Sequence, residues 1–538
     1  MSTKKKSNSS KDYRSQLESD ILKLSKNNSL LAQFCSCYIA SLNTKSLHKY
    51  TATTLFKFLK TQFNYLIVFF EKKEDYLLDI QKTSQRTITI TLICPDVQYL
   101  IFTLENLFKQ FNLTITRMNH PLVSVYKNQK NEITFIDSPK KDSKLFSCCS
   151  IECQFENSNL DLVKLETNLK YRLNAALCIS KDTEKMMKNL IFVQHDVSKT
   201  PTHFPEFQKE WIELLDWLTN ENFSCFGYGE FLITKNENKY KIKLNESESL
   251  GLLSKNYLNY SNSKLTSIIK NQIKTLMDYR SPFIFDSLKY KSPIKRFDNL
   301  IRISLKIPTG QNKWIQYNFL GLLKRSSLLA KNTETPIIKL KIKKILEKKR
   351  FWPGSHNYYQ TIRLLNNVPK IELFKTAIEN LQEIIENLLS ITNPNDISFF
   401  KFKQIDKSKL FIMGVIPNSV FSNSNLTKII NYLETEIPNS GIEYFVIPSE
   451  QFVRIHIYFD QEKSNEFNLD LTKIESVVIE LIQPWEKRFH EILIKNLGIK
   501  KSNELYNKYV NSFPEHYKIR RAPSNAITDV NYFENATK

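Results

Sequence analysis

Glycine is scarce in this sequence, with nine residues in 538 and none before Gly227. A phosphate-binding loop needs glycines at fixed spacings, because only glycine lets the backbone approach a phosphate group closely. Gly227-Tyr228-Gly229 begins like a dinucleotide-binding fingerprint, but Leu232 occupies the position of the third glycine, and no P-loop spacing occurs anywhere. The sequence therefore predicts that this chain holds no nucleotide cofactor.

Patterns typical of catalytic and metal sites are also missing. The eight histidines form no HExxH or HxH pair, the eight cysteines form no CxxC pair, and there is no GxSxG elbow. His456 alternates with Ile455 and Ile457, which places it on the more polar face of an expected strand. We therefore expect no catalytic residue and no metal site.

Long apolar runs are absent as well. No stretch approaches the roughly 18 apolar residues that cross a bilayer, and the basic segment Met1–Ser7 has no apolar region after it. All eight cysteines lie between Cys35 and Cys225, and reduced thiols without a disulfide framework suit the cytosol. These features predict a cytoplasmic protein without a membrane partner.

Positive charge is abundant: 77 Lys and Arg against 55 Asp and Glu give a formal net charge of +22. Such a balance raises the hypothesis of nucleic-acid binding. However, lysine far outnumbers arginine, and the charges are spread along the chain with small groups at residues 4–6, 140–141 and 341–350. Nucleic-acid binding is therefore the least favoured function for this chain.

Hydrophobic periodicity predicts an α+β fold. Residues 17–58 have helical spacing, and the segment after them alternates like a strand and ends at Cys94-Pro95-Asp96, where Asp96 is placed to cap the next helix. The following pattern predicts a βαββαβ sandwich with helices at 97–111 and 162–177 and with strands at 87–92, 113–116, 122–126 and 148–155.

A second sandwich of this kind is predicted near the C-terminal end. Strands at 399–403, 410–416, 443–447 and 453–459 alternate with helices around residues 426–433 and 474–481. A helical pair at 359–365 and 371–389 precedes them, and Pro369 marks the turn between the two helices. The fold class expected is thus α+β, with tandem ferredoxin-like modules joined by helical segments.

Several interrupted stretches between the two sandwiches carry a family resemblance. They are Phe226-Gly227-Tyr228, Leu250-Gly251, Lys295-Arg296-Phe297, the strand containing Gly321, and Phe351-Trp352-Pro353-Gly354-Ser355-His356. In this order they resemble the N-terminal regulatory region of the large bacterial NAD-specific glutamate dehydrogenases. The resemblance implies three ACT-type modules ahead of a separate dehydrogenase domain, which would begin beyond Asp529 and would therefore be missing from this chain.

The resemblance and the periodicity together predict the domain boundaries. We expect a disordered tail of about 12 residues and a helical segment up to residue 79, ACT-like modules at 80–190, 205–355 and 396–490, a helical hairpin at 356–395, and a C-terminal helix and linker at 491–538. Gly321, Gly354 and the Ser355-His356 pair are interpreted as structural positions of the middle module.

The function implied is that of a regulatory and assembly region of an NAD-dependent glutamate dehydrogenase, without activity of its own. ACT modules elsewhere bind amino acids where the first strand meets the first helix, which here means Cys94-Pro95-Asp96 and Pro417-Asn418-Ser419. Neither turn contains glycine, so we expect packing in an oligomer rather than effector binding. A stand-alone amino-acid sensor is the alternative, and expected partners are further copies of the chain, a separately encoded catalytic polypeptide and an amino-acid effector.

Overall fold

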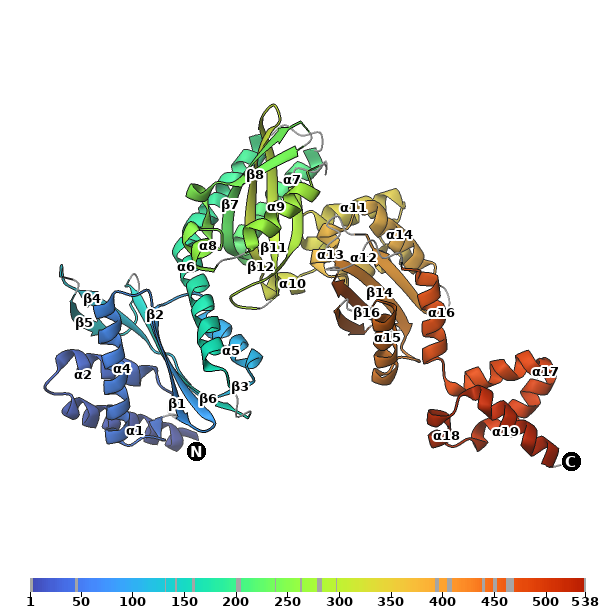
Figure 1. Ribbon diagram of the computed structural model, residues 1–538, viewed down its shortest axis with the longest axis horizontal. Coiled ribbons are helices and arrows are strands. Elements are labelled where there is room, and N and C mark those ends of the chain that lie inside the picture. The colour runs from blue at the N-terminus through green and yellow to red at the C-terminus, as the bar shows by residue number, and fades with distance from the viewer. Residues whose placement is uncertain are drawn as a thin grey trace. The chain divides into compact units, whose positions relative to one another are not determined.

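The computed structural model describes residues 3–43, 47–130, 132–140, 143–156, 160–199, 205–237, 239–261, 264–277, 283–296, 298–391, 396–403, 409–437, 441–448, 452–460 and 469–536 (Figure 1). The chain divides into two compact units. Unit 1 is residues 1–201 and 218–324, and unit 2 is residues 202–217 and 325–538. Across the described ranges, no helix has the length and hydrophobicity needed to cross a membrane.

The described residues at the start of unit 1 include helices α1 (Thr3–Leu24), α2 (Ser29–Ser41) and α4 (Ala52–Lys72). Helix α1 includes residues that the sequence predicts to be a disordered tail. The predicted helical segment is divided because Asn28 and Thr51 accept hydrogen bonds from backbone N–H groups at the starts of α2 and α4. Aromatic side chains of α4, Phe69 and Phe70, pack edge-on against Phe146 of the first sheet.

The first sheet is antiparallel throughout and follows the order β1-β2-β6-β4-β5, while β3 also pairs with β6. Its strands are β1 (Leu77–Ser84), β2 (Thr87–Pro95), β3 (Leu113–Asn119), β4 (Leu122–Lys127), β5 (Ile133–Asp137) and β6 (Leu145–Phe155). Figure 1 shows helices α5 (Leu100–Gln110) and α6 (Leu162–Lys199) on the side of this sheet opposite α4.

In a βαββαβ sandwich the third strand lies between the first and the second. Here β6 lies between β2 and β3 in this way, and the predicted strands and helices of this segment are present. The position on the other side of β2 is taken by β1, which precedes β2 in the sequence and pairs with it as a hairpin. The prediction missed β1 because the second half of this strand, residues 81–84, is polar and exposed.

The middle sheet of unit 1 has a different topology, in the order β10-β11-β12-β7-β8, with β9 beside β7. Its strands are β7 (Phe223–Asn236), β8 (Lys239–Leu244), β9 (Leu250–Gly251), β10 (Phe283–Lys291), β11 (Asn299–Gly310) and β12 (Lys313–Leu323), with helices α8 (Lys255–Ser261) and α9 (Leu265–Thr275) between β9 and β10. The last strand thus pairs with the first, and the order differs from that of the first sheet. The predicted module at 205–355 also crosses the boundary between the two units.

Unit 2 contains α7 (Pro205–Trp217) and a group of helices: α10 (Arg325–Leu329), α11 (Ile338–Lys348), α12 (His356–Asn366), α13 (Lys370–Lys375) and α14 (Ile378–Leu389). The predicted helix at 371–389 is interrupted between α13 and α14, because Thr376 and Ala377 have extended backbone angles. These helices are followed by a four-stranded sheet.

The sheet of unit 2 follows the order β13-β14-β16-β15 and is antiparallel. Its strands are β13 (Ser398–Phe402), β14 (Lys409–Pro417), β15 (Ile442–Pro448) and β16 (Phe452–Asp460), and its helices are α15 (Asn423–Glu436) and α16 (Leu471–Ile482). Strand β16 lies between β14 and β15, and β13 occupies the place beside β14. This arrangement repeats that of β1, β2, β6 and β3 in the first sheet.

Both faces of this sheet are covered. One face packs with α15 and α16 in an apolar core. The other face carries Phe402, Phe411, Arg454 and His456, and all four side chains are buried. His456 thus lies on the more polar face of its strand, and that face is buried, which the alternation of side chains alone does not reveal.

The C-terminal segment forms a helical cluster with a core of its own. It comprises α17 (Trp485–Tyr509), α18 (Glu515–Arg520) and α19 (Pro523–Ala536). Helix α17 is interrupted at Gly498, which has φ of 76°. Left-handed backbone of this kind strongly favours glycine.

Candidate functional site

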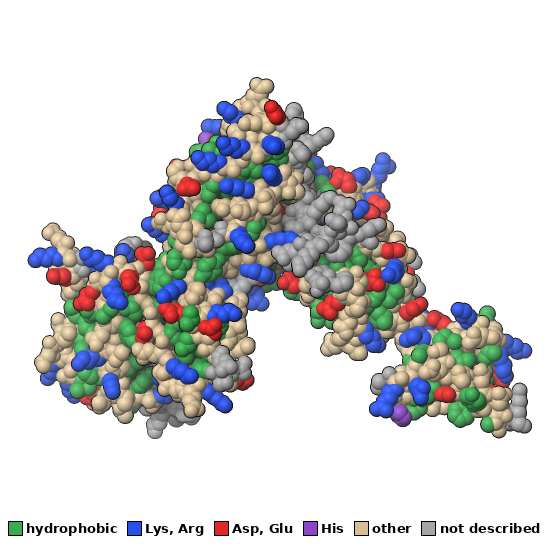
Figure 2. Space-filling view, viewed as in Figure 1, with side chains coloured by type: hydrophobic (Ala, Val, Ile, Leu, Met, Phe, Trp, Pro, Cys, Tyr) green, Lys and Arg blue, Asp and Glu red, His purple; other side chains and the backbone are tan. Residues whose placement is uncertain are grey.

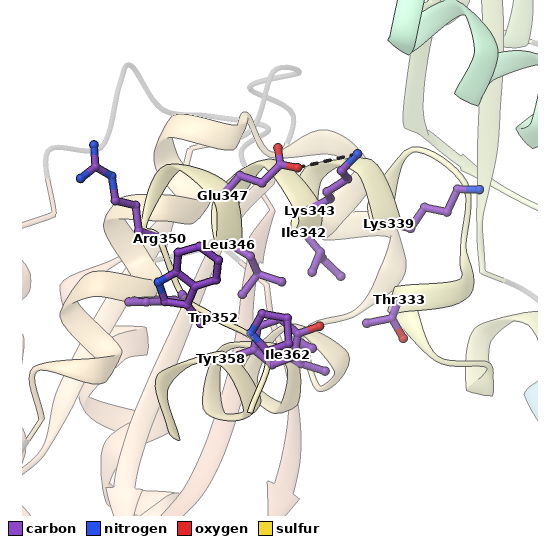
Figure 3. A pocket seen from close by; sticks show the side chains of 12 residues that line it. Thr333, Lys339, Ile342, Lys343, Leu346, Glu347, Arg350, Trp352, Tyr358 and Ile362 are labelled. Atoms are coloured by element: carbon purple, nitrogen blue, oxygen red, sulfur yellow. Dashed lines mark ion pairs between the residues drawn. The ribbon is translucent and has the colours of Figure 1, made fainter. Parts of the chain in front are cut away.

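A groove in unit 2 is formed by α11, the turn after it and α12 (Figure 3). It has a volume of about 520 Å³, and its floor is made by apolar side chains such as Ile342, Leu346 and Ile362. Trp352 stands at one side of the groove with 76% of its surface exposed. Lys339, Lys343 and Arg350 lie around the groove, so its rim is mainly cationic.

The start of α11 is fixed by contacts with α7. Ile337 has φ of 67°, which is unusual for a β-branched residue, and its N–H donates to the Glu210 carboxylate at 2.9 Å. Lys339 forms ion pairs with Glu210 and with Glu213. The two carboxylates of α7 therefore hold the first turn of α11 and one side of the groove rim.

The turn after α11 contains the predicted motif Pro353-Gly354-Ser355-His356. Gly354 has φ of 94°, and the Ser355 hydroxyl accepts a hydrogen bond from the Tyr358 N–H at 3.3 Å. Ser355 is thus the N-cap of α12, and His356 is the exposed first residue of that helix. Pro353 lines the groove. These residues shape the turn and form no pair of nucleophile and base.

Two buried lysines hold the helices behind the groove together. The Lys341 ammonium donates to the carbonyl oxygens of Leu373, Phe374 and Thr376 at 2.7, 2.9 and 2.8 Å. These are carbonyls at the end of α13, which have no partners within that helix. Burial lowers the pKa of Lys341 to about 7.

Lys370 is the second buried lysine. Its ammonium donates to the carbonyl oxygen of Ala330 at 2.6 Å and to Asn332 Oδ1 at 2.8 Å. The Asn332 amide in turn donates to the carbonyls of Leu365 and Val368. Lys341 and Lys370 therefore cross-link α11, α12 and α13 through backbone carbonyls rather than through carboxylates.

In unit 1, the predicted motif at Lys295-Arg296 meets the start of helix α5. Lys295 has φ of 62°, and its backbone N–H donates to the Thr103 hydroxyl at 2.9 Å. Its ammonium donates to the Ser224 hydroxyl at 3.0 Å and lies 4.3 Å from the centre of the Tyr99 ring. Residues from α5, β7 and the turn before β11 thus converge at one point.

This cluster has excess positive charge. Burial, then the charges of Arg296 and Lys324, lower the pKa of Lys295 to about 8. Arg296 pairs with Asp298 and Lys324 pairs with Glu221, whereas within the described ranges no carboxylate forms an ion pair with Lys295. A half-buried ammonium without an acid partner is able to bind a carboxylate or another small anion.

The predicted effector turns differ from expectation in one respect. Asp96 does not cap α5, because that helix begins at Leu100 behind Tyr99, which has φ of 64°. The Asp96 carboxylate instead accepts a hydrogen bond from Ser147 at 3.3 Å, and Ser147 also contacts His120 at 2.8 Å.

The remaining residues of the two predicted effector turns lie at or just after the ends of strands β2 and β14. Cys94 and Pro95 end strand β2, and the Cys94 thiol is buried. Pro417 ends β14, and its carbonyl accepts from the N–H groups of residues 420 and 421. Asn418 and Ser419 follow it on the surface.

The other predicted motif residues lie in the middle sheet. Phe226 and Tyr228 are buried in β7, and Gly227 pairs with Gly251 and Leu320. A β-carbon at Gly321 would lie 2.0 Å from the Ser224 carbonyl oxygen, so this glycine permits close approach of β12 to β7. Phe297, the last residue of the Lys295 motif, lies outside the described residues.

One buried ionic group was missed by sequence reasoning. Arg302 and Asp286 face each other on β11 and β10, with Nε to Oδ1 at 3.0 Å and Nη2 to Oδ2 at 2.6 Å. Both side chains are almost completely buried. Isolated Arg and Asp residues in apolar strands are the only signal in the sequence, and they do not reveal their pairing.

Comparisons with known proteins connect these regions to one family. A family model for helical motif 1 of glutamate dehydrogenase matches residues 335–393, which contain α11 to α14 and most of the groove. A model for helical motif 2 matches residues 492–536 in the C-terminal helical cluster. These matches support the glutamate dehydrogenase family for this chain.

Similarity over a longer span agrees with the two motifs. The NAD-specific glutamate dehydrogenase of Pseudomonas aeruginosa is 22% identical over 451 residues, which is 82% of this chain and 28% of the relative. The enzyme of the same name from Halomonas elongata is 20% identical over 459 residues, with the same coverage of 82% and 28%. The chain thus spans between a quarter and a third of the length of these NAD-specific glutamate dehydrogenases.

Proposed function

We propose that these residues form the regulatory and assembly region of an NAD-dependent glutamate dehydrogenase and do not turn over glutamate by themselves. The observation that carries this proposal is the match of helical motif 1 to the helices cross-linked by Lys341 and Lys370. Those helices then act as a rigid scaffold, and NAD and glutamate bind elsewhere in the enzyme. The two sheets of similar strand order correspond to ACT-type modules of the regulatory region.

The arrangement of side chains supports a non-catalytic role. The groove on helical motif 1 is apolar with a cationic rim, and its lining contains neither a histidine nor a cysteine. The described residues contain no group of three or more His, Cys, Asp or Glu side chains able to hold a metal ion. The groove is therefore better suited to packing against protein than to chemistry.

An activity assay tests the proposal directly. The purified chain is incubated with glutamate and NAD, and NADH formation is followed by absorbance, with a complete NAD-specific glutamate dehydrogenase as the positive control. We expect no NADH above the level without glutamate. Glutamate-dependent NADH formation that copurifies with the chain would overturn the proposal.

An amino-acid sensor is the second candidate, and the Lys295 cluster is the observation that favours it. A carboxylate of an amino acid would pair with the Lys295 ammonium beside Ser224 and the start of α5. Calorimetric titration with glutamate distinguishes the two functions, since the assembly role expects no heat of binding. Lys295→Met would abolish a sensor's binding, whereas Lys313→Met, on an exposed strand end, would preserve it.

A further inference from the structure

A second pocket lies in the C-terminal helical cluster, between the end of α17, the start of α18 and helix α19. Its volume is about 440 Å³. One wall is a single face of α19, because residues three and four apart in a helix lie side by side. The lining includes five aromatic rings and one carboxylate, which belong to Tyr509, Phe513, Tyr517, Tyr532, Phe533 and Asp529.

Hydrogen bonds between the helices hold the walls of this pocket in place. The Tyr509 hydroxyl, at the end of α17, donates to the Glu534 carboxylate of α19 at 2.7 Å. The Tyr517 hydroxyl of α18 donates to Asp529 Oδ2. Burial and then this carboxylate raise the pKa of Tyr517 to about 12, which the charge of Arg521 only partly opposes. The phenol therefore stays protonated at neutral pH, and its bond fixes α18 against α19.

Asp529 is the only acidic residue in the lining, and the structure gives it no cationic partner. Within the described ranges, no lysine or arginine forms an ion pair with Asp529, and only its Oδ2 accepts a hydrogen bond. The cations at the neighbouring positions are already neutralised, since Lys508 pairs with Glu534 at 2.6 Å. In the same way, Lys518 pairs with Glu486 at 2.5 Å. Asp529 Oδ1 is thus available to a cation from outside the chain.

Aromatic rings beside a carboxylate favour a positively charged ligand, because the face of each ring carries a negative potential. This chemistry is opposite to that of the groove on helical motif 1, whose rim is mainly cationic. A guanidinium group suits such surroundings better than an ammonium group. It is planar, stacks on aromatic faces, is more weakly hydrated and donates N–H groups to a carboxylate in a fixed geometry.

We propose that this aromatic pocket binds the guanidinium group of an arginine side chain on another polypeptide. The guanidinium pairs with Asp529 and lies against the rings of Tyr532 and Phe533. The volume is within the range of pockets that enclose drug-sized molecules, so the aliphatic stem of the arginine is enclosed as well.

The surroundings of the pocket favour a polypeptide as the source of the guanidinium. Tyr532 is exposed by 71% and Phe533 by 56%, so their rings extend the apolar surface beyond the pocket itself. Residues on both sides of a bound arginine pack on this surface, whereas a free small cation leaves it exposed to water. Tyrosine, phenylalanine and arginine are also the residue types enriched in protein interfaces.

Ligand-observed NMR with the full chain tests this site. The probe is the tripeptide Gly-Arg-Gly, acetylated and amidated so that the guanidinium is its only charge. The control peptide contains citrulline, which has a similar shape but no charge. We expect saturable binding of the arginine peptide with a Kd of about 1 mM or tighter, and binding of the citrulline peptide weaker by about tenfold.

Variants of the chain assign the binding to this pocket. Asp529→Asn removes the charge but keeps an acceptor for the Tyr517 hydroxyl, and it should weaken binding of the arginine peptide about tenfold. Tyr532→Ala removes an exposed ring and should weaken binding roughly threefold or more. Tyr359→Ala is the matched control, because Tyr359 is exposed by 61% on α12 and does not line this pocket. Circular dichroism establishes that the variants are folded.

Absence of saturable binding, equal binding of the two peptides, or unchanged binding in Asp529→Asn would overturn the proposal. Free arginine distinguishes the source of the guanidinium, since we expect it to bind more weakly than the peptide. Equal or tighter binding of free arginine would assign the pocket to a small cation and would overturn a polypeptide ligand. None of these results bears on NADH formation, so this inference and the proposed function can fail separately.

Discussion

Lys341 shows how one charged residue stabilises helical motif 1. Three carbonyls at the end of α13 depend on its ammonium, and they lie too deep in the protein for water to replace it. Buried polar groups that lose their partners destabilise a protein by about 1–3 kcal/mol each. The ammonium therefore links α11 to α13 more strongly than a surface ion pair would.

Replacement of this residue should open the region locally. We expect Lys341→Met to destabilise α11 and α13 by about 2–4 kcal/mol, measured as faster amide hydrogen exchange in those helices. The control is Lys343→Met, which removes an exposed ion pair with Glu347 at 3.7 Å and should change exchange by less than about 1 kcal/mol. Equal effects of the two substitutions would show that the carbonyl contacts of Lys341 are unimportant.

His456 gives unit 2 a sensitivity to acid. Burial, and then the charge of Arg454, lower the pKa of His456 to about 4. An unfolded chain binds the proton near the ordinary value of about 6.5, so the unfolded state binds more protons between these two values. Stability is therefore lost as the pH falls from about 6.5 to about 4, by up to roughly 3 kcal/mol.

The melting temperature as a function of pH tests this. His456→Phe removes the titrating group, so the acid-induced loss of stability should shrink in this variant. His516→Phe, at an exposed position, should behave like the wild type. An unchanged pH profile in His456→Phe would mean that other groups cause the acid sensitivity.

At the level of elements, Gly321 controls the contact between the first and last strands of the middle sheet. The strand register shifts between Leu320 and Gly321, where β12 passes close to the Ser224 carbonyl. A methyl group at this position has no space without movement of the backbone. The pairing of β12 with β7 joins the strands β10 to β12 to the strands β7 and β8. It therefore depends on a residue without a side chain.

Gly321→Ala should destabilise unit 1 by about 2 kcal/mol or more, detected as a lower denaturant midpoint. Gly310→Ala is the matched control, since a β-carbon there meets nothing within 4 Å. It should leave the midpoint within about 0.5 kcal/mol of the wild type. If both variants have the same denaturant midpoint, the close approach at Gly321 does not contribute to the free energy of unfolding.

Local elements were largely predictable from the sequence, and their order in the sheets was predictable only in part. Alternation identified β2 and β16, and helical spacing identified α5 and α14, because each buries one regular face. Strand β1 was missed, and the strand predicted at 399–403 is present as β13 without its place beside β14 having been predicted, since the sequence pattern does not specify which strand fills a neighbouring position. The pairing of β12 with β7 joins residues about 90 apart in sequence, and hydrophobic periodicity carries no information on it.

The candidate sites were less predictable than the fold. The motifs at Lys295 and at Pro353 marked the correct regions, but the sequence did not show that Lys295 meets Tyr99 and Ser224. It also gave no sign that Lys341 and Lys370 are buried, because lysines on a helix normally point to solvent. Apart from Asn332, their partners are backbone carbonyls, which every sequence contains, so side-chain patterns cannot identify them.

At the scale of the whole molecule, the net charge of +22 is the feature that most suggests another function. Figure 2 shows lysine and arginine side chains interspersed with acidic ones over the visible face, without one continuous basic stripe. Many cations also have local carboxylate partners, as Lys473 has in Glu436 and Lys508 in Glu534. Tight binding to nucleic acid depends on many lysines and arginines that neutralise neighbouring phosphates together.

We therefore expect only weak, non-specific binding to nucleic acid. Fluorescence anisotropy with labelled duplex DNA and with RNA should give a Kd no tighter than about 1 µM at physiological salt. A basic protein of unrelated fold and similar net charge serves as the control for simple charge attraction. Binding much tighter than that control, with affinity falling steeply as salt rises from about 50 to about 200 mM, would require a phosphate-binding surface assembled from separate parts of the chain.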